Sequence, residues 1–131
     1  MIEEISWTFY GYQTAAGGRN VQEWFDGLLA EEREEAADTI GYLQRLPLAS
    51  WGKPQYHPLG GGLSEIRFTV NLLHKTYRIY GCFWPRKVRL SYTLLLGNNK
   101  KVKNPKHDVK ESRKRKDWIE EGKASIHEFE F

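Results

Sequence analysis

Three segments in the middle of the chain follow one another with the pattern of β-strands, and this succession restricts the fold most strongly. Apolar and polar side chains alternate over residues 63–70 and 74–84, and a largely apolar segment follows over residues 87–96. Turn residues separate the segments, at Asn71 and at residues 84–86. Strands joined by such short turns pair antiparallel, because a parallel pair needs a long crossover connection. The sequence therefore predicts a β-meander.

Helical patterns lie on both sides of this meander. Asn20 and Glu23 have the spacing of a capping box at the start of a first helix. Apolar side chains recur at helical spacing over about residues 31–45, and Pro47 ends this second helix. A strongly charged helix is predicted over about residues 106–121. We expect the first two helices to form an antiparallel hairpin, and the helices to cover one face of the sheet.

The two ends of the chain also carry strand-like alternation. Residues 5–12 predict an N-terminal strand, and the tail over residues 125–131 predicts either a short strand or a segment that awaits a partner. Residues 47–62, rich in proline and glycine, predict a loop. The predicted fold class is therefore α+β, with an N-terminal strand and a helical hairpin packed on a mainly antiparallel sheet, followed by a C-terminal charged helix. We expect a single domain over residues 1–131.

Residue counts exclude several classes of protein. The single cysteine, Cys82, rules out an internal disulfide and a zinc site of two or more cysteines, which predicts a cytoplasmic protein. The four histidines lack metal-binding spacing, so we expect no metal and no cofactor. The glycines at residues 60–62 lack the lysine and helix of a phosphate-binding P-loop. We also expect neither a secretory leader nor a membrane partner, since no run approaches roughly 20 apolar residues.

Charge is divided unevenly along the chain. Residues 1–38 hold nine acids and two bases, a net charge of −7, whereas residues 98–116 hold nine bases and two acids, a net charge of +7. A segment this basic predicts a polyanionic or an acidic protein partner, unless it is only a solvated surface. We expect its helical part to dock on RNA through phosphate contacts. The residues predicted to bind RNA are Lys103, Lys106, Lys110, Arg113, Lys114 and Arg115.

The most informative constellation lies on the predicted sheet, next to this basic segment. Because successive side chains of a strand point to opposite faces, Glu65 and Arg67 share an exposed face, and Arg78 of the next strand joins them. Two arginines on neighbouring strands can bind one phosphate through charge-assisted hydrogen bonds. The alternative is that Glu65 forms a cross-strand salt bridge with an arginine, worth about 0.2–1 kcal/mol if exposed.

These residue types match the needs of RNA cleavage without a metal. Such a reaction requires a base to activate the 2′-hydroxyl, cations to stabilise the charged transition state, and an acid to protonate the leaving 5′-oxygen. Lys100, Lys101 and His107 are the candidates for proton transfer, and Arg67 and Arg78 are the candidates for charge stabilisation. The alternative for His107 is a surface histidine at the start of a helix.

Four stretches carry a resemblance to a known family: VQEWFDGL, GGGLSEIRF, KTYRIYGCF and NKKVKNPKHDV. Together they resemble the RelE/ParE superfamily of toxins from bacterial toxin–antitoxin pairs, above all the phage-derived HigB-like branch. The resemblance covers about residues 20–120 and implies a RelE-like fold. It also implies a type II toxin that acts as a ribosome-dependent mRNA endoribonuclease and is neutralised by an antitoxin whose chain wraps it. The implied partners are this antitoxin, the ribosome and mRNA, with operator DNA bound through the antitoxin.

The resemblance assigns residues by position. Arg67 and Arg78 match the arginines of the family's two central strands, Lys100 and Lys101 match its basic pair, and His107 lies near a position where relatives place a tyrosine or a histidine. The chain departs from the pattern after its last predicted strand, where the usual aromatic general-base candidate is not evident.

Two other functions are compatible with this scaffold. One is a ParE-like, non-nucleolytic inhibitor of DNA gyrase, and the other is a nucleic-acid-binding module without catalysis. For the antitoxin we expect a contact at Phe129 and Phe131, or in a groove around the acidic helical hairpin.

Overall fold

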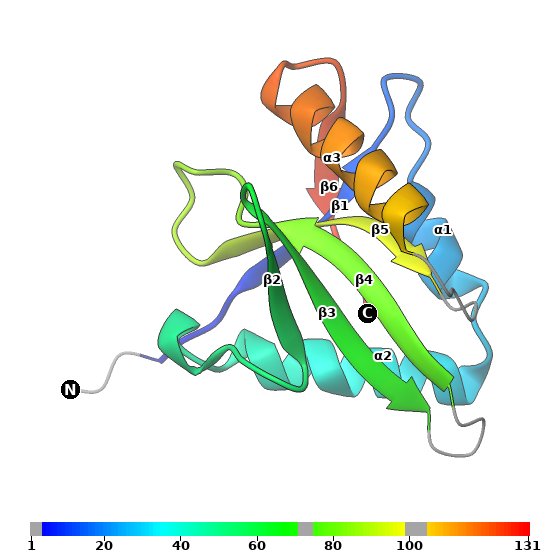
Figure 1. The fold of residues 1–131 in the computed structure, drawn as a ribbon, viewed down its shortest axis with the longest axis vertical. Coiled ribbons are helices and arrows are strands. Elements are labelled where there is room, and N and C mark those ends of the chain that lie inside the picture. The colour runs from blue at the N-terminus through cyan, green and yellow to red at the C-terminus, as the bar shows by residue number, and fades with distance from the viewer. Residues whose placement is uncertain (1–3, 71–74, 99–104) are drawn as a thin grey trace.

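The computed structural model describes residues 4–70, 75–98 and 105–131, and these form one mixed sheet flanked by helices (Figure 1). The residues 1–3, 71–74 and 99–104 lie outside this description. The elements, in chain order, are β1 (Thr8–Gln13), α1 (Asn20–Asp26), α2 (Ala30–Gln44), the 3-10 helix η1 (Leu48–Ser50), β2 (Tyr56–Gly60), β3 (Leu63–Val70), β4 (Lys75–Cys82), β5 (Ser91–Asn98), α3 (Lys106–Glu120) and β6 (Ser125–Glu128).

The sheet confirms the predicted meander and the α+β class. Its strand order is β2-β3-β4-β5-β1-β6, and β3, β4 and β5 pair antiparallel with their sequence neighbours. The N-terminal strand β1 lies parallel to β5, and the tail strand β6 pairs antiparallel with β1. The sheet is therefore mainly antiparallel, with β5 at an interior position as its apolar sequence predicts.

Two stretches differ from the sequence prediction. Residues 56–60, predicted as loop, form the edge strand β2, which tolerates Pro58 because an edge strand does not need every N–H in the ladder. The strand predicted to begin at residue 87 begins only at Ser91, because residues 83–90 form a longer connection than a tight turn. Leu90, at the end of this connection, has a φ of 53°, which strand geometry forbids.

The start of the first helix also differs from the prediction. Asn20 is the first helical residue, Arg19 is the N-cap, and no side-chain cap is present, so the predicted capping box at Asn20 and Glu23 is wrong. A side chain caps the second helix instead, where the backbone N–H of Leu29 donates to Glu32 Oε1 at 2.7 Å. This contact satisfies one of the donors that a helix start leaves unpaired.

The helices lie on both faces of the sheet, so the prediction that they cover one face is wrong. Gly97 of β5 lies against the ring of Trp24 in α1, and a Cβ at Gly97 would stand 2.3 Å from that ring. The next residue, Asn98, donates to the carboxylate of Asp108 in α3. Because neighbouring residues of a strand point to opposite faces, α1 and α3 lie on opposite faces. The helix α3 covers only part of its face of the sheet and leaves part of β3 and β4 uncovered beside it (Figure 1).

The main core lies between the sheet and the helices α1 and α2. Tyr77 of β4 is fully buried and donates its hydroxyl to Glu32 of α2. A cluster of aromatic rings fills the other end of this layer: Trp7, Phe9, Trp51, Tyr56, Phe83 and Tyr92. These contacts fix the position of β3 and β4 and hence of the side chains on their other face.

The tail belongs to the fold. Phe129 is buried, with its ring centre 5.4 Å from that of Phe25 in α1, and Gln22 exchanges hydrogen bonds of 2.8 and 2.9 Å with the backbone of Glu130. Burial makes Phe129 a core residue, which contradicts its predicted role as an antitoxin contact. Phe131 remains exposed, 6.0 Å from the ring of Phe9.

Candidate functional site

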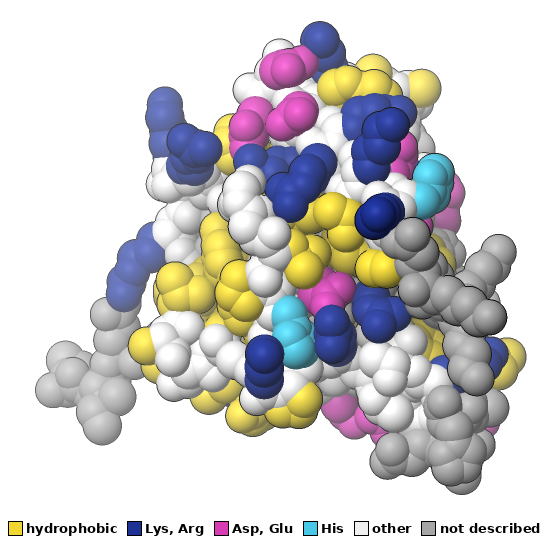
Figure 2. Space-filling model, in the orientation of Figure 1, with side chains coloured by type: hydrophobic (Ala, Val, Ile, Leu, Met, Phe, Trp, Pro, Cys, Tyr) yellow, Lys and Arg dark blue, Asp and Glu magenta, His cyan; other side chains and the backbone are white. Residues whose placement is uncertain are grey.

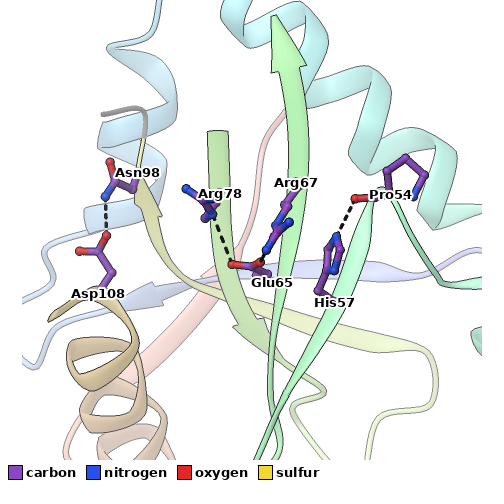
Figure 3. A network of polar contacts seen from close by, with 7 residues as sticks. All are labelled: Pro54, His57, Glu65, Arg67, Arg78, Asn98 and Asp108. Atoms are coloured by element: carbon purple, nitrogen blue, oxygen red, sulfur yellow. Dashed lines mark hydrogen bonds and ion pairs between the residues drawn. The ribbon is translucent and has the colours of Figure 1, made fainter. Parts of the chain in front are cut away.

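The two predicted arginines meet on the face of the sheet that α3 only partly covers. Arg67 of β3 and Arg78 of β4 are direct partners in the antiparallel register, so their side chains leave the sheet side by side (Figure 3). The face seen in Figure 2, in the same orientation as Figure 1, carries basic side chains over these strands and along α3. Like charges placed directly opposite each other repel, so this pair requires a counter-charge.

Glu65 supplies that counter-charge from a buried position. Only 3% of its side chain is exposed, which corrects the prediction of an exposed residue. The Nε and Nη2 groups of Arg67 both donate to Glu65 Oε1 at 2.5 Å, and Arg78 Nε lies 3.8 Å from Glu65 Oε2. The alternative predicted from the sequence, a salt bridge between Glu65 and an arginine, is thus present, and Glu65 pairs with both arginines. Figure 3 shows the carboxylate between them.

Arg67, Arg78 and Glu65 together form the arginine cluster, and this cluster retains hydrogen-bond donors for a further anion. The side chains of Arg67 and Arg78 are 37% and 26% exposed, so parts of both guanidinium groups face water. Two cations and one carboxylate leave the group with one net positive charge. Because an arginine carries several donors in a fixed plane, a guanidinium held on one edge by Glu65 can still bind a phosphate oxygen with another edge.

Two further polar residues lie near the arginine cluster: Tyr80 on β4 and Asp108 in the first turn of α3. Tyr80 is the register partner of Glu65 and is buried, and its hydroxyl has no hydrogen-bond partner among the described residues. Burial, with a smaller contribution from the charges of Glu65 and Asp108, raises the pKa of Tyr80 to about 12, although Arg78 and Arg67 act in the opposite direction. The phenol is therefore neutral at physiological pH. Because residues two apart on a strand share a face, Tyr80 lies on the same face as Arg78. This spacing could have identified Tyr80 as a site residue from the sequence.

The predicted proton-transfer residues are not brought to the arginines within the described part of the chain. Lys100, Lys101 and Lys103 lie outside the described residues. His107 is exposed in the first turn of α3 and lines a surface hollow together with Lys110 and Lys114. No described contact joins His107 to either arginine. The roles of these residues in proton transfer stay predictions.

Two of the predicted RNA-binding residues fasten α3 to the sheet. Arg113 donates to the carbonyl oxygens of Gly60 (3.0 Å) and Leu59 (3.3 Å). Arg115 donates to the carbonyl oxygen of Leu95 at 2.8 Å and stacks over a tyrosine ring. These contacts give both arginines a structural role that the sequence did not indicate, because the carbonyl partners lie far away in the chain.

The lysines of α3 remain better placed for an external partner. Lys106 and Lys110 are exposed, and Lys114 is half exposed while it pairs with Glu111 at 3.3 Å. Exposed ion pairs of this kind contribute little to stability and exchange readily for a phosphate. The predicted RNA-facing surface on α3 thus narrows to Lys106, Lys110 and Lys114.

A polar hollow of about 460 Å³ lies on the other side of Arg67. Lys53, His57, Thr69 and Thr76 contribute to its lining. The Nε2–H of His57 donates to the carbonyl oxygen of Pro54 at 3.0 Å, which fixes the ring beside Arg67 (Figure 3). The hollow therefore places a lysine and several hydrogen-bonding groups next to the guanidinium of Arg67, which can bind a phosphate oxygen.

Other chemistries find little support in the described residues. No group of three or more His, Cys, Asp or Glu side chains there could hold a metal ion. Cys82 is buried, and burial raises the pKa of its thiol to about 12, so it is a poor nucleophile. Within the same residues, no helix combines the length and apolar character that a membrane span requires.

One comparison with known proteins gives a match. The model of the family described as Phage derived protein Gp49-like (DUF891) matches residues 23–117, which is more than half of the chain. This range includes the described site from Lys53 to Asp108. No curated protein and no solved structure matches the chain.

Proposed function

The chain belongs to the phage-derived Gp49-like family, and from this membership and its arginine cluster we propose that it is the toxin of a type II toxin–antitoxin pair. The proposed activity is ribosome-dependent cleavage of mRNA. The observation that carries it is the pair Arg67 and Arg78, held by buried Glu65 and open to water on one side. The narrower assignment to the HigB-like branch of the RelE/ParE superfamily is part of the proposal.

The proposed reaction is a transfer within the RNA chain. The 2′-oxygen forms a bond to phosphorus, the bond from phosphorus to the 5′-oxygen breaks, and a proton moves from the 2′-hydroxyl to a base while the leaving oxygen receives one from an acid. Lys100, Lys101 and His107 are the candidates for these proton transfers. Arg67 and Arg78 stabilise the charge that develops on the phosphate oxygens.

The buried carboxylate explains how the arginines act without a large rearrangement. Electrostatic catalysis is most effective when donors are oriented before the substrate binds. Glu65 holds Arg67 through two donors and draws Arg78 toward the same point. Loss of one well-placed donor typically raises a barrier by about 3–4 kcal/mol, so either arginine should matter strongly for the rate.

The proposal assigns distinct roles to the partners. The ribosome presents mRNA to the open sheet face, and the exposed lysines of α3 contact ribosomal RNA. The antitoxin neutralises the toxin and carries the complex to operator DNA. Binding through phosphate contacts weakens with salt, so ribosome affinity should fall as salt concentration rises.

Translation of a reporter in cell extract, with primer extension on its mRNA, tests the proposal. We expect wild-type protein to stop translation and to produce cut mRNA, and Arg78→Ala to abolish both. Arg45→Ala is the matched control, because Arg45 is exposed at the end of α2, a helix that supplies no residue of the cluster. Intact mRNA with normal translation contradicts the proposal.

Two outcomes would instead favour the alternatives. Inhibition of gyrase supercoiling by added protein, with intact mRNA, would indicate the ParE-like function. Equal ribosome or RNA binding by wild type and Arg78→Ala, with no cleavage by either, would indicate a binding module.

A further inference from the structure

A third hollow lies beyond the end of β4, away from the arginine cluster. It has a volume of about 340 Å³ and lies between the β4–β5 connection, η1 and the residue before β1. Its lining is mainly apolar and includes Trp7, Leu48, Phe83, Val88 and Leu90. At roughly 3.3 Å per strand residue, the five residues from Arg78 to Phe83 separate this hollow from the cluster by roughly 16 Å.

Two large apolar side chains at this hollow are exposed to water. Leu48 is 51% exposed and Val88 is 42% exposed. They come from segments that are distant in sequence, yet both line the same hollow. Exposed apolar surface that borders a concavity is typical of a protein interaction site.

The rim of the hollow is basic. Arg86 lines it, and the neighbouring Lys87 is exposed as well. No acidic side chain belongs to the lining, and none of the ion pairs between described residues involves Arg86 or Lys87. Figure 2 shows apolar side chains beneath basic ones at the left of the molecule, where Figure 1 places the β4–β5 connection. An apolar surface with a basic rim is complementary to an apolar side chain flanked by acids.

The connection that forms this hollow is held in place by hydrogen bonds. The Ser91 hydroxyl lies 2.7 Å from the carbonyl oxygen of Val88 and 2.9 Å from that of Pro85, and Thr93 Oγ1 donates to the carbonyl oxygen of Trp84 at 2.9 Å. Leu90 keeps its left-handed backbone while its carbonyl oxygen accepts from Thr8 N–H at 2.9 Å. A surface ordered before binding loses less conformational entropy when a partner docks.

We propose that this hollow, formed by Trp7, Leu48, Phe83, Val88 and Leu90, docks an acidic segment of a partner protein. The segment inserts one or two large apolar side chains between Leu48 and Val88 and places Asp or Glu side chains beside Arg86 and Lys87. The inference rests on the proposed function in one respect, because it identifies the partner as the antitoxin. Since the arginine cluster lies elsewhere, the hollow anchors the antitoxin without itself covering the cluster.

The test measures antitoxin binding and mRNA cleavage separately on the full-length protein. The probe is the antitoxin encoded beside the toxin gene, titrated by calorimetry onto wild-type protein, Val88→Ser and the double variant Arg86→Glu/Lys87→Glu. We expect each variant to bind at least about tenfold more weakly, because one loses apolar contact and the other repels the acidic segment. We expect mRNA cleavage in the absence of antitoxin to stay within twofold of wild type.

Matched controls carry the same substitutions elsewhere on the surface. Leu29→Ser removes an exposed apolar side chain at the start of α2, and Lys123→Glu reverses an exposed charge that follows α3. Both should bind antitoxin as wild type does. Circular dichroism and thermal midpoints of all variants check that each one folds, as expected for substitutions at exposed positions.

Several results would overturn the inference. Antitoxin affinity of the hollow variants equal to wild type would do so, as would an equal loss in Leu29→Ser. Lower ribosome affinity of Arg86→Glu/Lys87→Glu with unchanged antitoxin affinity would make the rim an RNA contact instead. A wild-type dimer that Val88→Ser dissociates would make a second copy the occupant. If the protein does not cleave mRNA but the hollow variants still lose the antitoxin, the inference stands and the proposed activity fails.

Discussion

Removal of the charge on Glu65 is the perturbation whose effect the structure allows us to calculate best. Glu65→Gln keeps the shape of the side chain but removes the charge that holds Arg67 at 2.5 Å and Arg78 at 3.8 Å. A hydrogen bond to a charged group contributes about 1.5–3 kcal/mol, and the longer contact of a partly exposed arginine about 0.2–1 kcal/mol. Glutamine still accepts from Arg67, and water screens both guanidinium groups. We therefore expect the free energy of unfolding to fall by about 2 kcal/mol.

Urea unfolding followed by tryptophan fluorescence measures this change. At roughly 3 °C per kcal/mol for a domain of this size, the thermal midpoint should fall by roughly 6 °C. Glu121→Gln is the control, because its carboxylate is exposed and, among the described residues, pairs with exposed Lys123 at 2.9 Å. Its free energy of unfolding should change by less than about 0.5 kcal/mol. Equal stability of Glu65→Gln and wild type would refute the reasoning that this carboxylate offsets two facing arginines.

Further predictions concern the packing of the core and a buried thiol. Phe129→Ala should lower the free energy of unfolding by about 3–5 kcal/mol, because it removes a ring packed on Phe25; a loss below about 1 kcal/mol in urea unfolding would mean that the tail is not part of the core. Gly97→Ala places a methyl group 2.3 Å from the ring of Trp24 and should destabilise by about 1–3 kcal/mol; an unchanged thermal midpoint would contradict this close approach. Burial raises the pKa of Cys82 from 9.0 to about 12, so above pH 9 the unfolded chain releases this proton first and stability falls as pH rises toward 12. The urea midpoint should therefore fall more between about pH 8 and about pH 10.5 for wild type than for Cys82→Ala. An equal fall in both proteins would contradict a raised pKa of Cys82.

The sheet could be predicted where a local pattern determines it. The alternation over β3 and β4 has the period of a strand, so the meander and the shared face of Arg67 and Arg78 follow from the sequence alone. The edge strand β2 could not be predicted in the same way, because Pro58 and the adjacent glycines are typical of loops. Only pairing with β3, which is a property of the folded chain, makes this segment a strand.

The site could be predicted only in part, since burial depends on contacts between distant segments. Glu65 alternates with apolar residues like an exposed acid, yet it is buried between its register partners on β2 and β4, and it pairs with both arginines. Arg113 and Arg115 have the pattern of a basic RNA-facing helix, but carbonyl oxygens on other elements bind both of them. Tyr80 could have been predicted as a site residue, because it lies two residues after Arg78 and therefore on the same face of the strand.

The central claim is that the arginine cluster stabilises the transition state of mRNA cleavage, and a single-turnover measurement on purified ribosomes programmed with mRNA tests it most directly. For Arg67→Ala and Arg78→Ala we expect the cleavage rate at saturating protein to fall by about 10²–10³-fold, while affinity for the ribosome stays within a few-fold of wild type. The exposed control Arg45→Ala should match wild type in both quantities. Cleavage by Arg67→Ala and Arg78→Ala at the wild-type rate would contradict the account.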